Sequence, residues 1–291
     1  MSLREDAKKL YTSSLAKLDP SGAVFDYLSL NKIVSSNYKK IYPVAFGKAS
    51  ISMMIGFLDY LSKEFPGLPI HEKPIVVSNI SNEKINYNVD LHFASHPIPD
   101  KKSIQAGDKV INYISSSTDN DLVVFLISGG ASALLAKPPS SITLDDKTIL
   151  TDLLLKSGAS INEMNTVRKH MSDIKGGRLA KLASPSTCYS LIISDVINDD
   201  ISSIASGPTI SDNTTYSDAM DILNRYNLSE YTPPSIIKHI ESGIQGHIEE
   251  SPSEIDNCTN KIISSNRLYR EQLFSFASDH GYLPIIIPRD I

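Results

Sequence analysis

The stretch 122–135, LVVFLISGGASALL, constrains the fold of this chain more than any other part of the sequence. An apolar, β-branched run stops at Ser128, turns at Gly129 and Gly130, and continues as a helix-forming run of alanine and leucine. A strand that enters a helix through such a turn directs backbone N–H groups and a helix N-terminus at one point, which suits an anion such as phosphate. An ordinary tight turn between strand and helix is the alternative. The candidate anion-binding residues are Ser128, Gly129, Gly130, Ala131 and Ser132.

Short β-branched runs alternate with longer helical patterns along the chain, which predicts βαβ units and a mainly parallel sheet. Strands are expected at residues 41–46, 74–78, 91–95, 122–127, 188–194, 261–264 and 283–287. Helices are expected at residues 49–64, 102–116, 131–136, 145–157, 162–172, 216–226 and 267–280. The predicted fold class is therefore α/β, a Rossmann-like and mainly parallel sheet with helices on both faces.

A boundary between two domains is predicted near residue 230. The segment 227–253 contains Pro233-Pro234, two glycines and several acidic residues, a composition typical of a connection between domains. We therefore expect a Rossmann-like catalytic domain at 38–230 and the start of a second α/β domain at 231–291, packed with the N-terminal helical residues 1–37. The chain ends in LPIIIPRDI, a predicted strand with nothing after it, so the second domain is expected to be truncated.

Composition and charge exclude several classes of protein. The net charge of −5 argues against a general nucleic-acid binder, which usually carries a basic surface. No apolar stretch approaches the roughly 18–20 residues that a membrane span needs, and residues 1–18 lack the apolar segment of a signal peptide. Cys188 and Cys258 have no metal-binding spacing. We expect a cytoplasmic protein with no nucleic-acid or membrane partner, and homo-oligomerisation stays open.

Four predicted strands end in similar polar residues. They read AFGKAS at 45–50, LISGGAS at 126–132, LIISDVINDD at 191–200 and IISSNR at 262–267. An open α/β sheet holds its ligands at the carboxyl ends of its strands. The convergence of glycine, serine, asparagine, aspartate and lysine at one edge predicts an active site there.

Lys48 and Asp195 are the strongest candidates for chemistry. Lys48 lies where a strand gives way to a helix, a position unfavourable for a cation unless an anion is bound; a solvated lysine is the alternative. Asp195 follows an apolar strand directly and suits a metal ligand or a general base, although it also fits a helix N-cap. Asp199 and Asp200 follow, either as further Mg²⁺ ligands or as a solvated turn.

The stretch 165–180, NTVRKHMSDIKGGRLA, concentrates cations in an otherwise acidic chain. These residues form either a cationic wall for a multiply charged ligand or a solvated helix surface. His170 is interpreted as a structural histidine. The loop ASHPIPD at 94–100 is stiffened by two prolines and either lines a pocket or ends a strand. The loop IASGPT at 204–209 suits close backbone approach, and Ser265-Asn266 either cap the next helix or bind a ligand.

With these motifs together, the chain resembles the class II glycerate kinases, the glycerate 2-kinase group whose C-terminal part is called the MOFRL domain. The matching motifs are AFGKAS, SHPIPD, LISGGASALL, NTVRKHMSDIKGGRLA, LIISDVINDDISSIASGPT and SSNRL, in the order of that family. The resemblance implies transfer of the γ-phosphate of ATP to D-glycerate, with Mg²⁺ or a similar divalent cation, to give 2-phosphoglycerate. Relatives labelled hydroxypyruvate reductase make an NAD(P)H-dependent reductase the alternative, and a non-catalytic fragment is a further one.

The resemblance also implies roles for particular residues. Lys48 and Asp195 would be catalytic, and Asp195 with Asp199 would hold the metal ion. Substrate and nucleotide would be bound by the 128–132 loop and by Asn165, Arg168, Lys169, Lys175, Gly207 and Asn266. The chain departs from the family at Asn198, where the motif has glycine; asparagine tolerates the left-handed conformation, so the turn is expected to survive. The family's glycine-rich C-terminal segment and its arginine are absent, so weak turnover is expected.

Overall fold

Six strands form one parallel sheet in the computed structural model, which describes residues 3–15, 18–81 and 85–287. The sheet order is β3-β2-β1-β4-β5-β6. The strands are β1 (Ile41–Phe46), β2 (Ile75–Ser78), β3 (Asp90–Phe93), β4 (Leu122–Ile127), β5 (Thr187–Ser194) and β6 (Cys258–Ser265). All neighbouring strands run parallel. This arrangement confirms the predicted α/β fold and the first six predicted strands.

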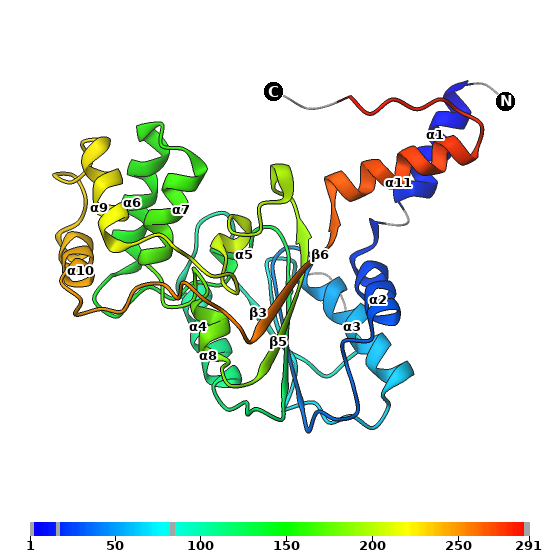
Figure 1. Cartoon of the computed structure of the whole chain (residues 1–291), viewed down its shortest axis with the longest axis horizontal. Helices are drawn as coiled ribbons and strands as arrows, with labels where there is room; N and C mark the ends of the chain where they lie inside the picture. The colour runs from blue at the N-terminus through cyan, green and yellow to red at the C-terminus, as the bar shows by residue number, and fades with distance from the viewer. Residues whose placement is uncertain (1–2, 16–17, 82–84, 288–291) are drawn as a thin grey trace.

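Alternating side chains of the central strands build a core on each face of the sheet. Tyr42 and Phe46 pack on one face with α4 (Lys101–Ile114) and α8 (Arg178–Leu182). Ile41 and Ala45 pack on the other face with α2 (Pro20–Asn31) and α3 (Ser50–Glu64). Figure 1 shows these two layers on opposite sides of the strands. A strand buried on both faces is apolar throughout, which explains the continuous runs in the sequence.

Four helices form a separate cluster beside the sheet, far from α2 and α3 in Figure 1. They are α6 (Leu144–Ser157), α7 (Ile161–His170), α9 (Tyr216–Arg225) and α10 (Pro234–Ile244). Their apolar faces share a core that includes Leu154, Val167, Leu223 and Ile240. The segment 227–253, expected as a connection, therefore contains a packed helix. Pro234 is compatible with helix because a proline at the first helical position loses no hydrogen bond.

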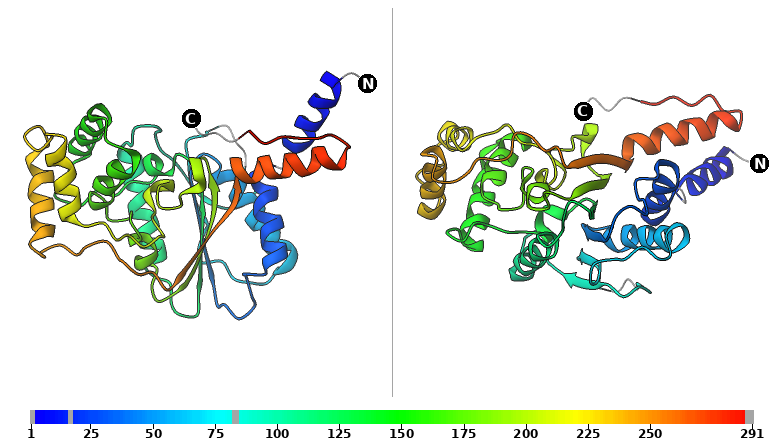
Figure 2. Two further views of the ribbon diagram at one scale, coloured as in Figure 1. Left: turned by 45° about the horizontal axis from the view of Figure 1, so that its top comes forward. Right: turned by 60° about the horizontal axis from the view of Figure 1, so that its bottom comes forward.

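The residues on both sides of the predicted boundary near 230 share one sheet, because β6 pairs with β5. Helix α11 (Asn266–Asp279) follows β6, and α1 (Leu3–Leu15) lies beside it, as Figures 1 and 2 show. A hydrogen bond of 2.9 Å joins the Ser14 and Tyr269 hydroxyls. The N-terminal region thus contributes two helices, α1 and α2. A second domain at 231–291 stays a prediction.

The strand predicted at 283–287 is wrong. These residues are irregular, and the side chains of Leu283 and Ile285 are 97% and 87% exposed. A β-branched run becomes a strand only where a neighbouring strand supplies hydrogen bonds, and none of the described strands pairs with this one. Within the described residues, no helix is long and apolar enough to cross a membrane.

The close approach of α2 to α3 depends on Gly56. A Cβ at this position would overlap the backbone carbonyl of Ser21, whereas a Cβ at Gly67 would meet nothing within 4 Å. We expect Gly56→Ala to lower the free energy of unfolding by about 1–3 kcal/mol, because the two helices must separate. The matched Gly67→Ala variant is expected to stay within about 0.5 kcal/mol of the parent. Urea denaturation measures both, and equal stabilities would show that this helix pair is not tightly packed.

Candidate active site

The sheet order creates a crevice between the carboxyl ends of β1 and β4. From β1 the chain continues into α3 on one face, and from β4 it continues into α5 (Ala131–Leu134) on the other. From this point the sheet grows outward in both directions: β2 and β3 follow β1 on one side, and β5 and β6 follow β4 on the other. In open α/β sheets, ligands bind at such a switch point, outside the carboxyl ends of the strands.

The two loops at the crevice are joined by hydrogen bonds. The Lys48 N–H donates to the Gly129 carbonyl at 2.9 Å, and the Ala49 N–H donates to the Ser128 hydroxyl at 3.0 Å. Gly47 has a φ of +126°, and a Cβ there would overlap the Ser128 hydroxyl and carbonyl. Glycine is therefore required at Gly47, both for its backbone conformation and for the contact between the loops.

Lys48 and Asp195 flank the glycine turn. A Cβ at Gly130 would lie 3.1 Å from Cε of Lys48, and a Cβ at Gly129 would overlap the Asp195 carboxylate. His96 joins them: its Cδ2 would lie 3.0 Å from the same Gly130 Cβ. Burial lowers the pKa of His96, the Lys48 ammonium lowers it further, and Asp195 opposes these effects. Three titratable groups thus meet at one turn.

A cavity of about 160 Å³ opens beside this turn. Gly130 of the turn lines it, and its polar and charged side chains are those of His96, Ser132, Lys147, Thr151, Arg168 and Lys175. The sequence singled out Gly130, Ser132, Arg168 and Lys175, and it named the loop 94–100 as a possible pocket wall without singling out His96. It missed Lys147. On α6, Lys147 lies three and seven residues before the buried Leu150 and Leu154, so all three share one face of the helix. A lysine on an otherwise apolar helix stripe was the available signal.

The pKa values of the cations around the cavity are lowered, mainly by burial. Burial and the nearby Arg168 lower the pKa of Lys147 from 10.5 to about 8. Burial, together with Lys147 and Arg168, holds the pKa of Lys175 well below its usual value. Burial also lowers the pKa of the Arg168 guanidinium. A buried cation is costly without a counter-charge, so this cavity favours an anion.

Lys175 is held by the loops behind the cavity. Its ammonium donates to the Ser132 hydroxyl and to the Ala205 carbonyl, the latter at 3.1 Å. The Ser132 and Ser206 hydroxyls are 3.1 Å apart, and Ser206 donates to Asn165 at 3.3 Å. Asn165 therefore supports the wall of the cavity from behind.

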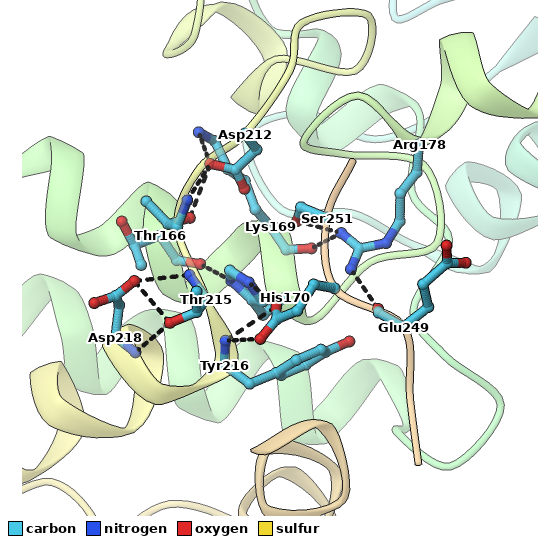
Figure 3. Close-up of polar contacts among 12 residues, drawn as sticks. Thr166, Lys169, His170, Arg178, Asp212, Thr215, Tyr216, Asp218, Glu249 and Ser251 are labelled. Carbon is cyan, nitrogen blue, oxygen red and sulfur yellow. Dashed lines mark hydrogen bonds and ion pairs between the residues drawn. The ribbon is translucent and has the colours of Figure 1, made fainter. Parts of the chain in front are cut away.

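Lys169 takes part in a structural network instead of lining the cavity. Figure 3 shows it beside Asp212, and the ion pair measures 3.1 Å with both side chains buried. His170 bonds the Thr166 carbonyl at 2.8 Å and Glu250 at 3.2 Å, which confirms a structural histidine. The expected position of Lys169 in the cleft is therefore corrected. On α7, Arg168 lines the cavity, while the next residue points into the helical cluster.

Asp199 and Asn266 serve the junction between β5, β6 and α11. Asp199 accepts a hydrogen bond from Ser265 at 2.9 Å and pairs with Arg267 at 3.1 Å. Ser265 caps α11, and Asn266 begins that helix. Neither Asn266 nor Gly207 lines the cavity. Asn198 has a φ of 64°, so the turn survives the replacement of the motif glycine, as predicted.

The described residues contain no group of three or more His, Cys, Asp or Glu side chains that could hold a metal ion. Asp195 lies at the glycine turn, whereas the Asp199 carboxylate is engaged by Ser265 and Arg267. A dedicated protein cage for a metal is thus not formed by these residues. One carboxylate nevertheless fits Mg²⁺ bound with a nucleotide, because this ion commonly takes one or two carboxylates and completes its shell with phosphate oxygens and water.

A family model described as "Domain of unknown function (DUF4147)" matches residues 6–241. The chain belongs to the DUF4147 family. Similar proteins include the "Glycerate 2-kinase" of Pyrococcus horikoshii, 38% identical over 99% of this chain and 65% of that protein. The "D-glycerate 2-kinase" of Thermotoga maritima is 32% identical over 98% of this chain and 64% of its own length. A "Putative hydroxypyruvate reductase" of Agrobacterium vitis is 36% identical over 99% of this chain and 62% of its own length.

Solved structures agree with these comparisons. A crystal structure titled as glycerate kinase from Thermotoga maritima has a TM-score of 0.84 at 32% identity, with 97% of this chain and 65% of that chain covered. A protein from Pyrococcus horikoshii OT3 gives the same TM-score at 38% identity, over 97% and 64% of the two chains. The resemblance of this DUF4147 chain to glycerate 2-kinases is confirmed, and the chain spans about 65% of the length of such relatives.

Lys147 and Lys169 are both buried, but their surroundings predict opposite effects of replacement by methionine. Lys169→Met leaves the buried Asp212 carboxylate without its cation, so we expect the free energy of unfolding to fall by about 3–5 kcal/mol. Lys147→Met removes a buried ammonium that has no hydrogen-bond partner among the described residues. Its midpoint of thermal unfolding at pH 7 is therefore expected to rise.

The stabilisation by Lys147→Met is expected to shrink at higher pH. The pKa of Lys147 is about 8 in the folded protein, against an ordinary value of 10.5. Between these values the unfolded parent chain binds more protons than the folded one, so the stability of the parent rises with pH and approaches that of the variant. Unfolding curves at pH 7 and pH 9.5 test both lysines. Destabilisation by both Lys147→Met and Lys169→Met would contradict the prediction that these replacements have opposite effects.

Proposed function

We propose that this protein transfers the γ-phosphate of ATP to D-glycerate and forms 2-phosphoglycerate. The supporting observation is the meeting of Lys48 and Asp195 at the Gly129-Gly130 turn, beside a cavity lined by cations. The relatives from Pyrococcus horikoshii and Thermotoga maritima that carry glycerate 2-kinase names give the substrate and the class of reaction. Physical chemistry alone supports an anion site; the choice of glycerate rests on the relatives.

In-line transfer of a phosphoryl group depends mostly on positioning and on neutralisation of charge. The backbone N–H groups of the 128–132 loop would hold the phosphate oxygens, since the turn leads into α5 at Ala131. The Lys48 ammonium would neutralise charge that develops on the transferring group. The Asp195 carboxylate would orient the 2-hydroxyl of glycerate and accept its proton.

A divalent cation belongs to the same proposal. Asp195 would be its protein ligand, and when bound with the nucleotide the ion would neutralise charge on the phosphates. Asp199 is not included, because its carboxylate already accepts hydrogen bonds from Ser265 and Arg267. The cytoplasmic location and the homo-oligomer considered from the sequence stay predictions.

A hydroxypyruvate reductase is the second candidate, because relatives from Agrobacterium vitis carry that name and the sheet has the strand order of dinucleotide-binding proteins. The turn after β1 reads AFGKAS and lacks the G-x-G-x-x-G pattern by which such proteins approach a pyrophosphate. Oxidation of NADH by hydroxypyruvate, followed by absorbance, would favour this candidate.

We expect Lys48→Ala and Asp195→Asn each to lower the rate of phosphate transfer by at least ~10²-fold while the protein stays folded. The reason is the loss of a charge that acts on the transferring phosphate or on the attacking hydroxyl. ADP release in a coupled assay measures the rate, and circular dichroism checks the fold. Lys101→Ala, an exposed lysine at the start of α4, is the matched control. A near-normal rate in either variant would remove that residue from the mechanism.

The reaction itself is tested by incubation of the 291-residue protein with ATP, Mg²⁺ and D-glycerate, followed by ³¹P NMR of the products. Formation of 2-phosphoglycerate supports the proposal, and formation of 3-phosphoglycerate would correct the position of transfer. Where no product forms, calorimetric titration with ATP and with glycerate distinguishes a fragment that binds the two compounds from one that binds neither. Absence of both binding and product would overturn the proposal.

A further inference from the structure

Lys147 is a buried lysine at the cavity beside the glycine turn. Its side chain lines the cavity, and the residue is 7% exposed. Its Nζ has no hydrogen-bond partner among the described residues. Buried ammonium groups are almost always paired, because an unpaired one loses its hydration without compensation. The missing partner is therefore expected to come from a ligand.

The groups that face Lys147 define the charge of that ligand. Arg168 from α7 lowers the pKa of Lys147, and Lys147 and Arg168 in turn lower the pKa of Lys175 in the segment that follows α7. His96 reaches the same cavity from the 94–100 loop. Asp173 is the nearby carboxyl group and favours the charged lysine, yet Lys147 forms no hydrogen bond with it. The excess positive charge selects an anion.

Lys147 and Lys175 differ in how much of their hydrogen-bonding capacity is free. Lys175 donates to Ser132 and to Ala205, so its ammonium is used to hold the loops together. Lys147 makes no such bond in the described structure. Arg168 adds a planar group with five donors, which suits a carboxylate. Among the lysines and arginine that line the cavity, Lys147 and Arg168 thus have donors left free by the described residues.

We propose that Lys147 and Arg168 together bind the carboxylate of the acceptor, a small hydroxy acid, beside the turn that holds the transferring phosphate. This proposal rests on the function proposed above and assigns the recognition of its substrate. The cavity of about 160 Å³ is smaller than the roughly 300–1,000 Å³ of pockets for drug-sized ligands, so it suits a three-carbon acid better than a nucleotide. Gly130 and Ser132 also line it, which brings the acid next to the glycine turn.

Binding of the acid is linked to protonation of Lys147. With a pKa of about 8, this group is charged at pH 7 and mostly neutral at pH 9. An anion favours the charged form, so binding takes up a proton at higher pH and the affinity falls as pH rises through about 8. Arg168 stays charged throughout this range, and glycerate stays ionised.

Calorimetric titration of the 291-residue protein with D-glycerate tests the assignment. For the parent protein, the Kd is expected to rise about tenfold between pH 7 and pH 9, with proton uptake visible as a heat that depends on the buffer. Lys147→Met is expected to raise the Kd at pH 7 at least tenfold and to weaken its pH dependence. Lys147→Arg is expected to keep most of the affinity at pH 7 and also to weaken the pH dependence, because arginine stays charged. Glycerol, which lacks the carboxylate, is expected not to bind.

Lys156→Met is the matched control, since Lys156 lies on the same helix but is exposed and pairs with Asp152. It is expected to bind glycerate as the parent does. Glycerate affinity in Lys147→Met equal to that of the parent would overturn the assignment, and so would a parent protein that does not bind glycerate. Formation of 2-phosphoglycerate with an unchanged KM for glycerate in Lys147→Met would refute the assignment alone. Lys147-dependent binding without phosphate transfer would refute the kinase alone.

Discussion

The contact between the loops after β1 and β4 is the constraint on which the site depends. Both strands are central and buried, so their carboxyl ends reach the same edge of the sheet in register. Gly47 lies against Ser128 so closely that a side chain has no room. This contact fixes the position of Lys48 relative to the glycine turn, and Asp195 reaches the same turn from the end of β5. The loops after β1, β4 and β5 thereby bring Lys48, the glycine turn and Asp195 together.

The helical cluster supplies the other half of the site. Helices α6, α7, α9 and α10 have their own apolar core, separate from the two cores of the sheet. From this cluster, Lys147 and Arg168 reach the cavity, while the neighbouring Lys169 is neutralised by Asp212. The two kinds of cation differ in their partners: Lys169 pairs with a buried carboxylate, whereas Lys147 has no hydrogen-bond partner among the described residues. Buried charge that is left unpaired costs stability, so its retention points to binding.

Local patterns in the sequence predicted the parts of this structure that depend on neighbours along the chain. The apolar runs located six strands, and the polar residues that follow them located Lys48, Asp195 and the glycine turn. Contacts between residues far apart in the sequence could not be predicted from local patterns. The residues next to Lys169 do not predict its pairing with Asp212, which lies 43 positions away. The residues next to Leu283 do not show that none of the described strands pairs with this segment. Lys147 had a local signal, a charge on an apolar stripe, but its meaning depended on Arg168 from another helix.

In the proposed function, the arrangement would separate the two anionic groups that a kinase for a hydroxy acid must hold at once. Backbone N–H groups at a glycine turn are neutral donors and suit a phosphate whose charge changes during transfer. Side-chain cations such as Lys147 and Arg168 suit a carboxylate whose charge stays constant. The glycine turn belongs to the sheet, and Lys147 and Arg168 belong to the helical cluster, so each can be adjusted without disturbing the core of the other. If the proposed function holds, a sheet with the strand order of dinucleotide-binding proteins would serve a small acid through helices added at its edge.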